Sequence, residues 1–133
     1  MVTHDEAVAL ITSLPAVEEY TSYGNRAWRV KGTMFAWDRP LRKADIKRLG
    51  DEPVPEGPIL GLKVGDLGEK DAVLAAGTPG IFTIAHFDGY PSILAQLDVI
   101  SPDDLDDAVV DAWLASAPDA LATEYLRDHP LDG

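Results

Sequence analysis

The sequence predicts an α+β domain, a two-layer sandwich in which a five-stranded antiparallel sheet carries its helices on one face. Apolar residues recur with helical spacing near both ends and once in the middle of the chain, whereas other segments alternate with a period of two. Short links join most of the strand-like segments, which favours antiparallel pairing. The expected order is α-β-β-β-α-β-β-α, and helices separated from strands in this way cover one face.

The first half of the chain is expected to form a helix and a hairpin. Thr3 and Glu6 have the spacing of a capping box, which starts a helix over residues 3–14. At residue 26 the period changes to two, which predicts a hairpin over residues 26–37 with one buried face and one basic face. Residues 41–57 are rich in proline and are expected to leave the sheet, with one short helix among them.

The second half is expected to supply the remaining strands and helices. Strands are expected over residues 59–64, 81–87 and 92–99. Helices are expected over residues 66–76, from Ser101 to Pro118, and in a short last segment ending near Leu126. The helix that begins at Ser101 has an apolar stripe predicted to face the core, formed by Leu105, Val109, Ala112 and Trp113.

Length and composition indicate a globular protein. The chain has 133 residues, of which 46% are hydrophobic and 26% charged, so one domain spanning residues 1–133 is expected. The absence of cysteine excludes a disulfide framework, a zinc ribbon and a cysteine nucleophile. The first residues are acidic and no apolar run reaches the roughly 20 residues of a membrane helix, so no membrane role and a cytoplasmic location are expected.

Charge is distributed unevenly along the chain. The net charge is -12, which on average argues against polyanionic partners. The segment from Arg26 to Arg48, however, contains eight basic residues and only two acidic ones. Its net charge is therefore +6, and the rest of the chain carries -18. This asymmetry makes the basic segment the strongest candidate for a binding surface.

The basic segment contains the candidate site residues. Phosphate contact needs flexible cations, and base stacking needs an exposed aromatic ring. The candidates for binding nucleic acid or another anion are Arg29, Lys31, Trp37, Arg39, Arg42, Lys43, Lys47 and Arg48. In the alternative interpretation, these bases pair with acids of the same chain.

The sequence contains no recognisable catalytic constellation. Neither a Walker phosphate loop nor a Gly-x-Ser-x-Gly nucleophile elbow occurs. His86 and Asp88, two residues apart at an expected strand end, are the one pair that could serve a metal or a general base, and a structural histidine is the alternative. No catalytic residue, cofactor or metal is therefore predicted.

Several segments resemble the MmcQ/YjbR family of small bacterial proteins. They are Leu14–Val17, Tyr23-Gly24, the run Trp28–Ala36 and Leu62–Val64, followed by the helices in the same order. The resemblance implies a frataxin-like (CyaY-like) sandwich with a five-stranded antiparallel sheet, and DNA binding by a "double-wing" arrangement. Similar proteins carry a lysine and a tryptophan between the last two strands, and residues 82–91 of this chain have neither.

Frataxin-like proteins also present acidic surfaces to iron, and the helix after Ser101 is acidic in its first turns. Carboxylates along one convex helix face diverge, whereas a hard cation needs converging oxygens. A solvated face that complements the helix dipole is the favoured interpretation.

These observations predict a non-enzymatic binding protein of the MmcQ/YjbR kind, which binds nucleic acid weakly through the basic hairpin and loop. The alternative is a protein-interaction adaptor without a DNA role, which uses the sheet face and the charge asymmetry. The oligomeric state stays open.

Overall fold

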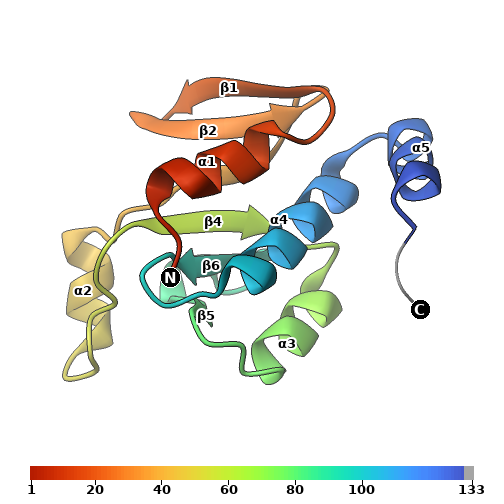
Figure 1. Ribbon diagram of the computed structural model, residues 1–133. Helices are drawn as coiled ribbons and strands as arrows, with labels where there is room; N and C mark the ends of the chain where they lie inside the picture. Colours follow the sequence, from red (N-terminus) through yellow and green to blue (C-terminus); the bar gives the residue numbers. More distant parts are fainter. Residues whose placement is uncertain (131–133) are drawn as a thin grey trace.

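The computed structural model describes residues 1–130, which contain a six-stranded antiparallel sheet. Its hydrogen-bonded order is β1-β2-β3-β4-β6-β5, so only β5 and β6 depart from sequence order (Figure 1). The strands are β1 (Val17–Ser22), β2 (Asn25–Val30), β3 (Thr33–Asp38), β4 (Ile59–Lys63), β5 (Ile81–Phe82) and β6 (Ser92–Gln96). The α+β class and the antiparallel pairing are confirmed, but the expected number of five strands is wrong.

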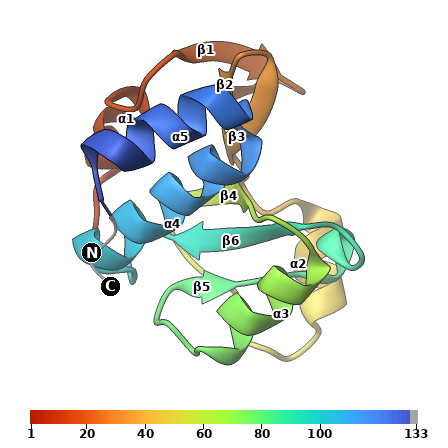
Figure 2. The same ribbon diagram turned by 90° about the vertical axis from the view of Figure 1, so that its right-hand side faces the viewer.

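Two helices cover one face of the sheet. Helices α1 (His4–Thr12) and α4 (Pro102–Ser116) lie side by side across it (Figure 1). Helix α3 (Leu67–Ala75) lies beside the β5 end of the sheet, as Figure 2 shows. Helix α5 (Asp119–Asp128) follows α4 and is joined to it by Tyr125, whose ring centroid lies 5.0 Å from that of Trp113.

The helices begin where local sequence signals predict. Thr3 Oγ1 accepts a hydrogen bond from the Glu6 backbone N–H, and the Glu6 carboxylate accepts one from the Thr3 backbone. Asp66 and Ser101 cap α3 and α4 in the same way, each accepting from a backbone N–H three residues ahead. These caps satisfy N–H groups that a helix leaves without an internal partner.

Strand β1 was not predicted from the sequence. Its residues alternate poorly, because Glu18 and Glu19 follow one another and the strand lies at the sheet edge. Two-residue turns join β1 to β2 at Tyr23-Gly24 and β2 to β3 at Lys31-Gly32, and all four residues have positive φ. Turns of this kind suit the twist of a hairpin and favour glycine at the second position.

Strand β3 contains a β-bulge, which places two consecutive residues on the same face of the sheet. Trp28 pairs with Ala36 and Arg29 pairs with Met34, so Phe35 is an extra residue. Phe35 and Ala36 both join the core beneath α1 and α4. Met34 and Trp37 line a cavity on the opposite face.

The main core lies between the sheet and helices α1 and α4. Trp28 and Trp113 are fully buried there, and so is the predicted stripe of α4, Leu105, Val109, Ala112 and Trp113. Burying large aromatic groups contributes much of the stability of a small domain. None of the helices in residues 1–130 is long and apolar enough to cross a membrane.

Helices were expected on one face only, and this expectation needs correction. A second, smaller core of buried Ile59, Ile84 and Leu94 is covered by Leu41, Phe82 and Phe87. It lies on the far side of the sheet from α1 and α4, where the short 3-10 helix η1 (Ala85–Phe87) packs against α2 (Lys43–Leu49). The proline-rich excursion therefore partly covers the second face.

Candidate functional site

A concave cavity of about 440 Å³ occupies the part of the second face that α2 and η1 leave open. Its size falls in the range typical of small-molecule sites. The lining comes from β3, β4, the start of β6, the β1–β2 hairpin around its turn, the segment between β3 and α2, and residues 86–91. Its members are Ser22, Tyr23, Asn25, Met34, Trp37, Asp38, Arg39, Arg42, Lys63, His86, Phe87, Tyr90, Pro91 and Ser92.

Trp37 lies flat over a strand because its neighbour has no side chain. Trp37 pairs with Gly61 across β3 and β4, and a Cβ on Gly61 would lie 2.1 Å from Trp37 Cε2. Only glycine allows the indole to approach the β4 backbone so closely. The other side of the indole is bounded by Phe87, whose ring centroid is 6.1 Å away.

Gly61→Ala is expected to displace Trp37 and to lower the free energy of unfolding by about 1–3 kcal/mol, as overpacking does elsewhere. Urea unfolding followed by circular dichroism measures the loss. Gly68→Ala is the matched control, because the closest atom to its added Cβ is the tip of Asp66 at 3.3 Å. A Gly61→Ala protein as stable as the control would contradict this account of the cavity floor.

A buried ion pair forms one end of the cavity. Arg39 and Asp45 are each only 4% exposed, and Arg39 Nη2 lies 3.0 Å from Asp45 Oδ2, although not aligned for a hydrogen bond. Arg39 Nη1 donates to the Pro40 carbonyl at 2.6 Å, and the guanidinium lies 5.3 Å from the Phe87 ring centroid. Arg39 therefore joins α2, β3 and η1.

Asp45 holds α2 in place through its charge. Burial by itself raises the pKa of Asp45, but the Arg42 backbone N–H at 2.9 Å and the Arg39 guanidinium outweigh it and lower the pKa below its usual value. The carboxylate is thus ionised at neutral pH, and it also caps the first turn of α2.

The segment that carries His86 and Tyr90 is held by a buried lysine. Lys70 on α3 is 5% exposed, and its Nζ donates to the carbonyls of Phe87 at 2.7 Å and Tyr90 at 2.8 Å. The expected strand over residues 81–87 is wrong beyond Phe82, because β5 is limited to Ile81–Phe82 and residues 85–87 form η1. Lys70 binds two carbonyls at and after the end of η1.

The predicted basic surface is divided by the fold. Arg29 forms an ion pair with Glu18 and lies 4.5 Å over the Tyr20 ring. Lys31 is exposed in the β2–β3 turn, at the opposite end of β3 from α2. A six-residue strand spans roughly 20 Å, so Lys31 is remote from the cations of α2.

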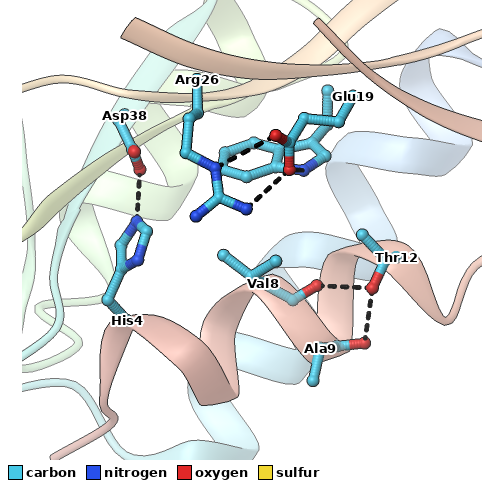
Figure 3. A network of polar contacts seen from close by, with 8 residues as sticks. His4, Val8, Ala9, Thr12, Glu19, Arg26 and Asp38 are labelled. Carbon is cyan, nitrogen blue, oxygen red and sulfur yellow. Dashed lines mark hydrogen bonds and ion pairs between the residues drawn. The ribbon is translucent and has the colours of Figure 1, made fainter.

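Arg26 also has a partner within the chain. Its Nη2 lies 2.7 Å from Glu19 Oε1, which also accepts from Trp28 Nε1 at 3.1 Å. This hydrogen bond to Arg26 holds the pKa of Glu19 below its usual value. Figure 3 shows the pair beside α1, next to the His4–Asp38 contact at 2.9 Å. The group joins α1 to the sheet and is structural.

The other predicted residues fall into three groups. Arg39, expected to face a partner, is instead buried in the ion pair with Asp45. Trp37 is half-buried in the cavity. Four cations are exposed on and before α2, and no acid lies within ion-pair distance of them in residues 1–130; they are Arg42, Lys43, Lys47 and Arg48.

His86 and Asp88 do not form a joint site. They lie in and after η1 instead of on a strand, and they line different hollows. Within residues 1–130, no cluster of three or more histidines and acids is arranged to hold a metal ion.

On α4, burial together with Glu69 and Asp107 raises the pKa of Asp111.

Comparison with known proteins identifies the family. The YjbR family model matches residues 12–115. The chain belongs to the YjbR family. It is also 41% identical over 132 residues to an uncharacterised protein of Mycobacterium bovis and to two from strains of Mycobacterium tuberculosis. Each alignment covers 96% of this chain and 98% of the relative. The expected resemblance is thus confirmed.

Four residues that form or support the site were not predicted as site residues from the sequence: Gly61, Lys63, Lys70 and Ser92. Gly61 was detectable as a glycine within an apolar strand, which often marks close approach of another group. Lys70 gave no local signal, because its partners lie 17 and 20 residues along the chain.

Proposed function

We propose that this YjbR family member is a non-enzymatic binding protein that contacts nucleic acid weakly through α2. The observation that carries the proposal is the group of four exposed cations, Arg42, Lys43, Lys47 and Arg48, without acid partners in the described chain. Lys43 and Lys47 are four residues apart and share one helix face. Two adjacent cations can neutralise neighbouring phosphates.

The charge of the remaining protein favours an oriented contact. The chain carries -12 overall, so a polyanion is repelled from most other surfaces. Trp37 and the exposed Tyr90 lie at the adjacent cavity and offer rings on which unpaired bases can stack. This arrangement supports single strands over duplexes as the preferred partner.

The test is a titration of labelled single-stranded and duplex DNA at several salt concentrations. For single strands, we expect Lys43→Glu/Lys47→Glu to weaken binding at low salt and to reduce the log–log salt slope by about 1.4, or about 0.7 for each lost phosphate contact. Lys31→Glu/Arg127→Glu is the matched control, because it makes the same charge change at exposed sites away from α2.

Two results would contradict the proposal. The first is no binding to either DNA at tens of micromolar protein and low salt. The second is an equal loss in both double variants, since net charge alone would then explain the attraction. A retained slope in the α2 variant would place the contact elsewhere.

A protein-interaction adaptor is the second candidate. Two exposed apolar side chains favour it. Ile46 within α2 is 42% exposed, and Val54 in the following loop is 41% exposed. A pull-down repeated after nuclease treatment separates the candidates. A protein partner that survives the nuclease and is lost with Ile46→Asp would favour the adaptor.

A further inference from the structure

One buried polar group in the cavity over Trp37 lacks a hydrogen-bond partner among the described residues. Ser92 is 4% exposed, lines the cavity, and its Oγ has no partner. Arg39, which also lines the cavity, is paired instead, with its Nη2 3.0 Å from Asp45 Oδ2 and its Nη1 donating to the Pro40 carbonyl. Buried polar atoms in folded proteins are almost always bonded to protein or to ordered water, so the hydroxyl at this cavity wall needs a partner that a bound molecule can supply.

The rest of the lining indicates the chemistry of that ligand. Trp37 and Phe87 supply aromatic surface, and two exposed tyrosines flank it, Tyr23 at 94% and Tyr90 at 62% exposure. A planar ring can stack there, with tilted or offset geometry. Together these rings extend the aromatic surface that a planar ligand can cover.

The charged groups of the lining are mostly cationic. Arg42 and Lys63 line the cavity in addition to the buried Arg39. The sole carboxylate among the lining residues, Asp38, is turned to His4 on the other side of the sheet, with its Oδ1 2.9 Å from the histidine Nε2. An anionic group is therefore favoured over a cationic one.

We propose that this cavity binds a small aromatic anion, that is, a planar ring carrying a phosphate or a carboxylate. The ring stacks against Trp37, the anionic group is bound by Arg42 and Lys63, and Ser92 donates to a polar atom of the ligand. The proposal goes beyond the contact of α2 with nucleic acid. Trp37, Tyr90 and Arg42 serve both proposals, whereas Ser92 and Lys63 belong to the cavity alone.

Calorimetric titration with four probes tests the required chemistry. Adenosine monophosphate and 1-naphthoate both combine a ring with an anion, and they separate a nucleotide from an aromatic carboxylate as the source. Adenosine lacks the anion, and ribose 5-phosphate lacks the ring. At least one ring anion is expected to bind at least about tenfold more tightly than the two incomplete probes, as expected when a charge-assisted contact is lost.

Single variants test the assigned residues. Ser92→Ala should lower the affinity for the ring anion about fivefold. It should leave the melting temperature of the free protein unchanged or raise it, because the substitution removes an unpartnered polar group. Arg42→Gln should lower the affinity about tenfold. In the NMR spectrum, the indole N–H signal of Trp37 should shift, and those of buried Trp28 and Trp113 should not.

The outcomes also separate this proposal from the nucleic-acid contact. Ser92→Ala should leave the salt slope for DNA unchanged, and Lys43→Glu/Lys47→Glu should leave the ring anion bound. The proposal is overturned if neither ring anion binds at up to about 1 mM. It is also overturned if ribose 5-phosphate binds as tightly as the nucleotide, or if Ser92→Ala destabilises the free protein without changing affinity.

Discussion

Asp45→Asn is expected to lower the free energy of unfolding by about 3–5 kcal/mol, the usual cost of removing one partner from a buried ion pair. The amide keeps the shape of the side chain and can still accept from the Arg42 backbone N–H. It cannot balance the Arg39 guanidinium, which is 4% exposed and lies 3.0 Å from the carboxylate. Urea unfolding at neutral pH measures the effect.

Two controls separate charge from packing. Asp51→Asn removes an exposed acid just after α2 and should change stability by less than about 0.5 kcal/mol. Arg39→Met/Asp45→Asn removes both charges, and it should recover much of the stability that the single variant loses. If the double variant were less stable than Asp45→Asn, the uncompensated arginine would not be the cause.

The same pair predicts a pH dependence. The pKa of Asp45 is lower in the folded protein than the roughly 3.9 of an unfolded aspartate, so its contribution to stability is fully present above that value. The contribution is lost as the pH falls through the folded pKa. The stability difference between the natural protein and Asp45→Asn should therefore narrow below about pH 4. A constant difference down to pH 2.5 would contradict the assignment.

Helix starts were predictable from sequence because capping is local. Thr3, Asp66 and Ser101 each accept from a backbone group three residues away, so the whole device lies within one short segment. The buried stripe of α4 was predictable for a similar reason, since helical periodicity alone determines which side chains share a face.

Edge strands and charge pairing were not predictable in this way. Because β1 was omitted, Glu18 and Glu19 were not recognised as cross-strand partners of Arg29 and Arg26. The sequence left open whether the bases of the hairpin pair within the chain, and the structure shows that Arg26 and Arg29 do. Four exposed cations then remain together, on α2 and at Arg42 immediately before it.

The cavity depends on contacts between distant segments. Gly61 and Trp37 meet through the pairing of β3 with β4, and Ser92 enters through the pairing of β4 with β6. Each residue alone is an ordinary strand residue. Only the strand order, with β6 inserted between β4 and β5, brings these groups to one surface.

Lys70→Met is expected to release residues 83–91 and to lower the free energy of unfolding by about 2–4 kcal/mol. The substitution keeps the approximate length of the side chain but removes the ammonium from the Phe87 and Tyr90 carbonyls, which then accept only from the N–H groups of Tyr90 and Ser92. Hydrogen bonds from a charged donor contribute about 1.5–3 kcal/mol each, and removal of the buried ammonium offsets part of their loss. Urea unfolding gives the global loss, and amide hydrogen exchange locates it.

The exchange pattern should be local. The amides of Phe87, Asp88 and Tyr90 bond within this segment, so they should exchange faster in Lys70→Met than the amides of β2 and β3. Lys63→Met is the matched control. Lys63 lines the same cavity, and its substitution removes the same charge without changing the hydrogen bonds to these carbonyls. It should change binding of an anion while leaving the exchange of residues 83–91 unchanged.

Lys70 therefore links stability to the shape of the cavity. His86, Phe87 and Tyr90 form one wall, and the lysine holds that wall from α3 on the other side. Lys70→Met should weaken the binding of an aromatic anion, although Lys70 is not among the residues that line the cavity. Unchanged exchange together with unchanged affinity would show that the wall is held by the Phe87 contacts with Trp37 and Arg39 instead.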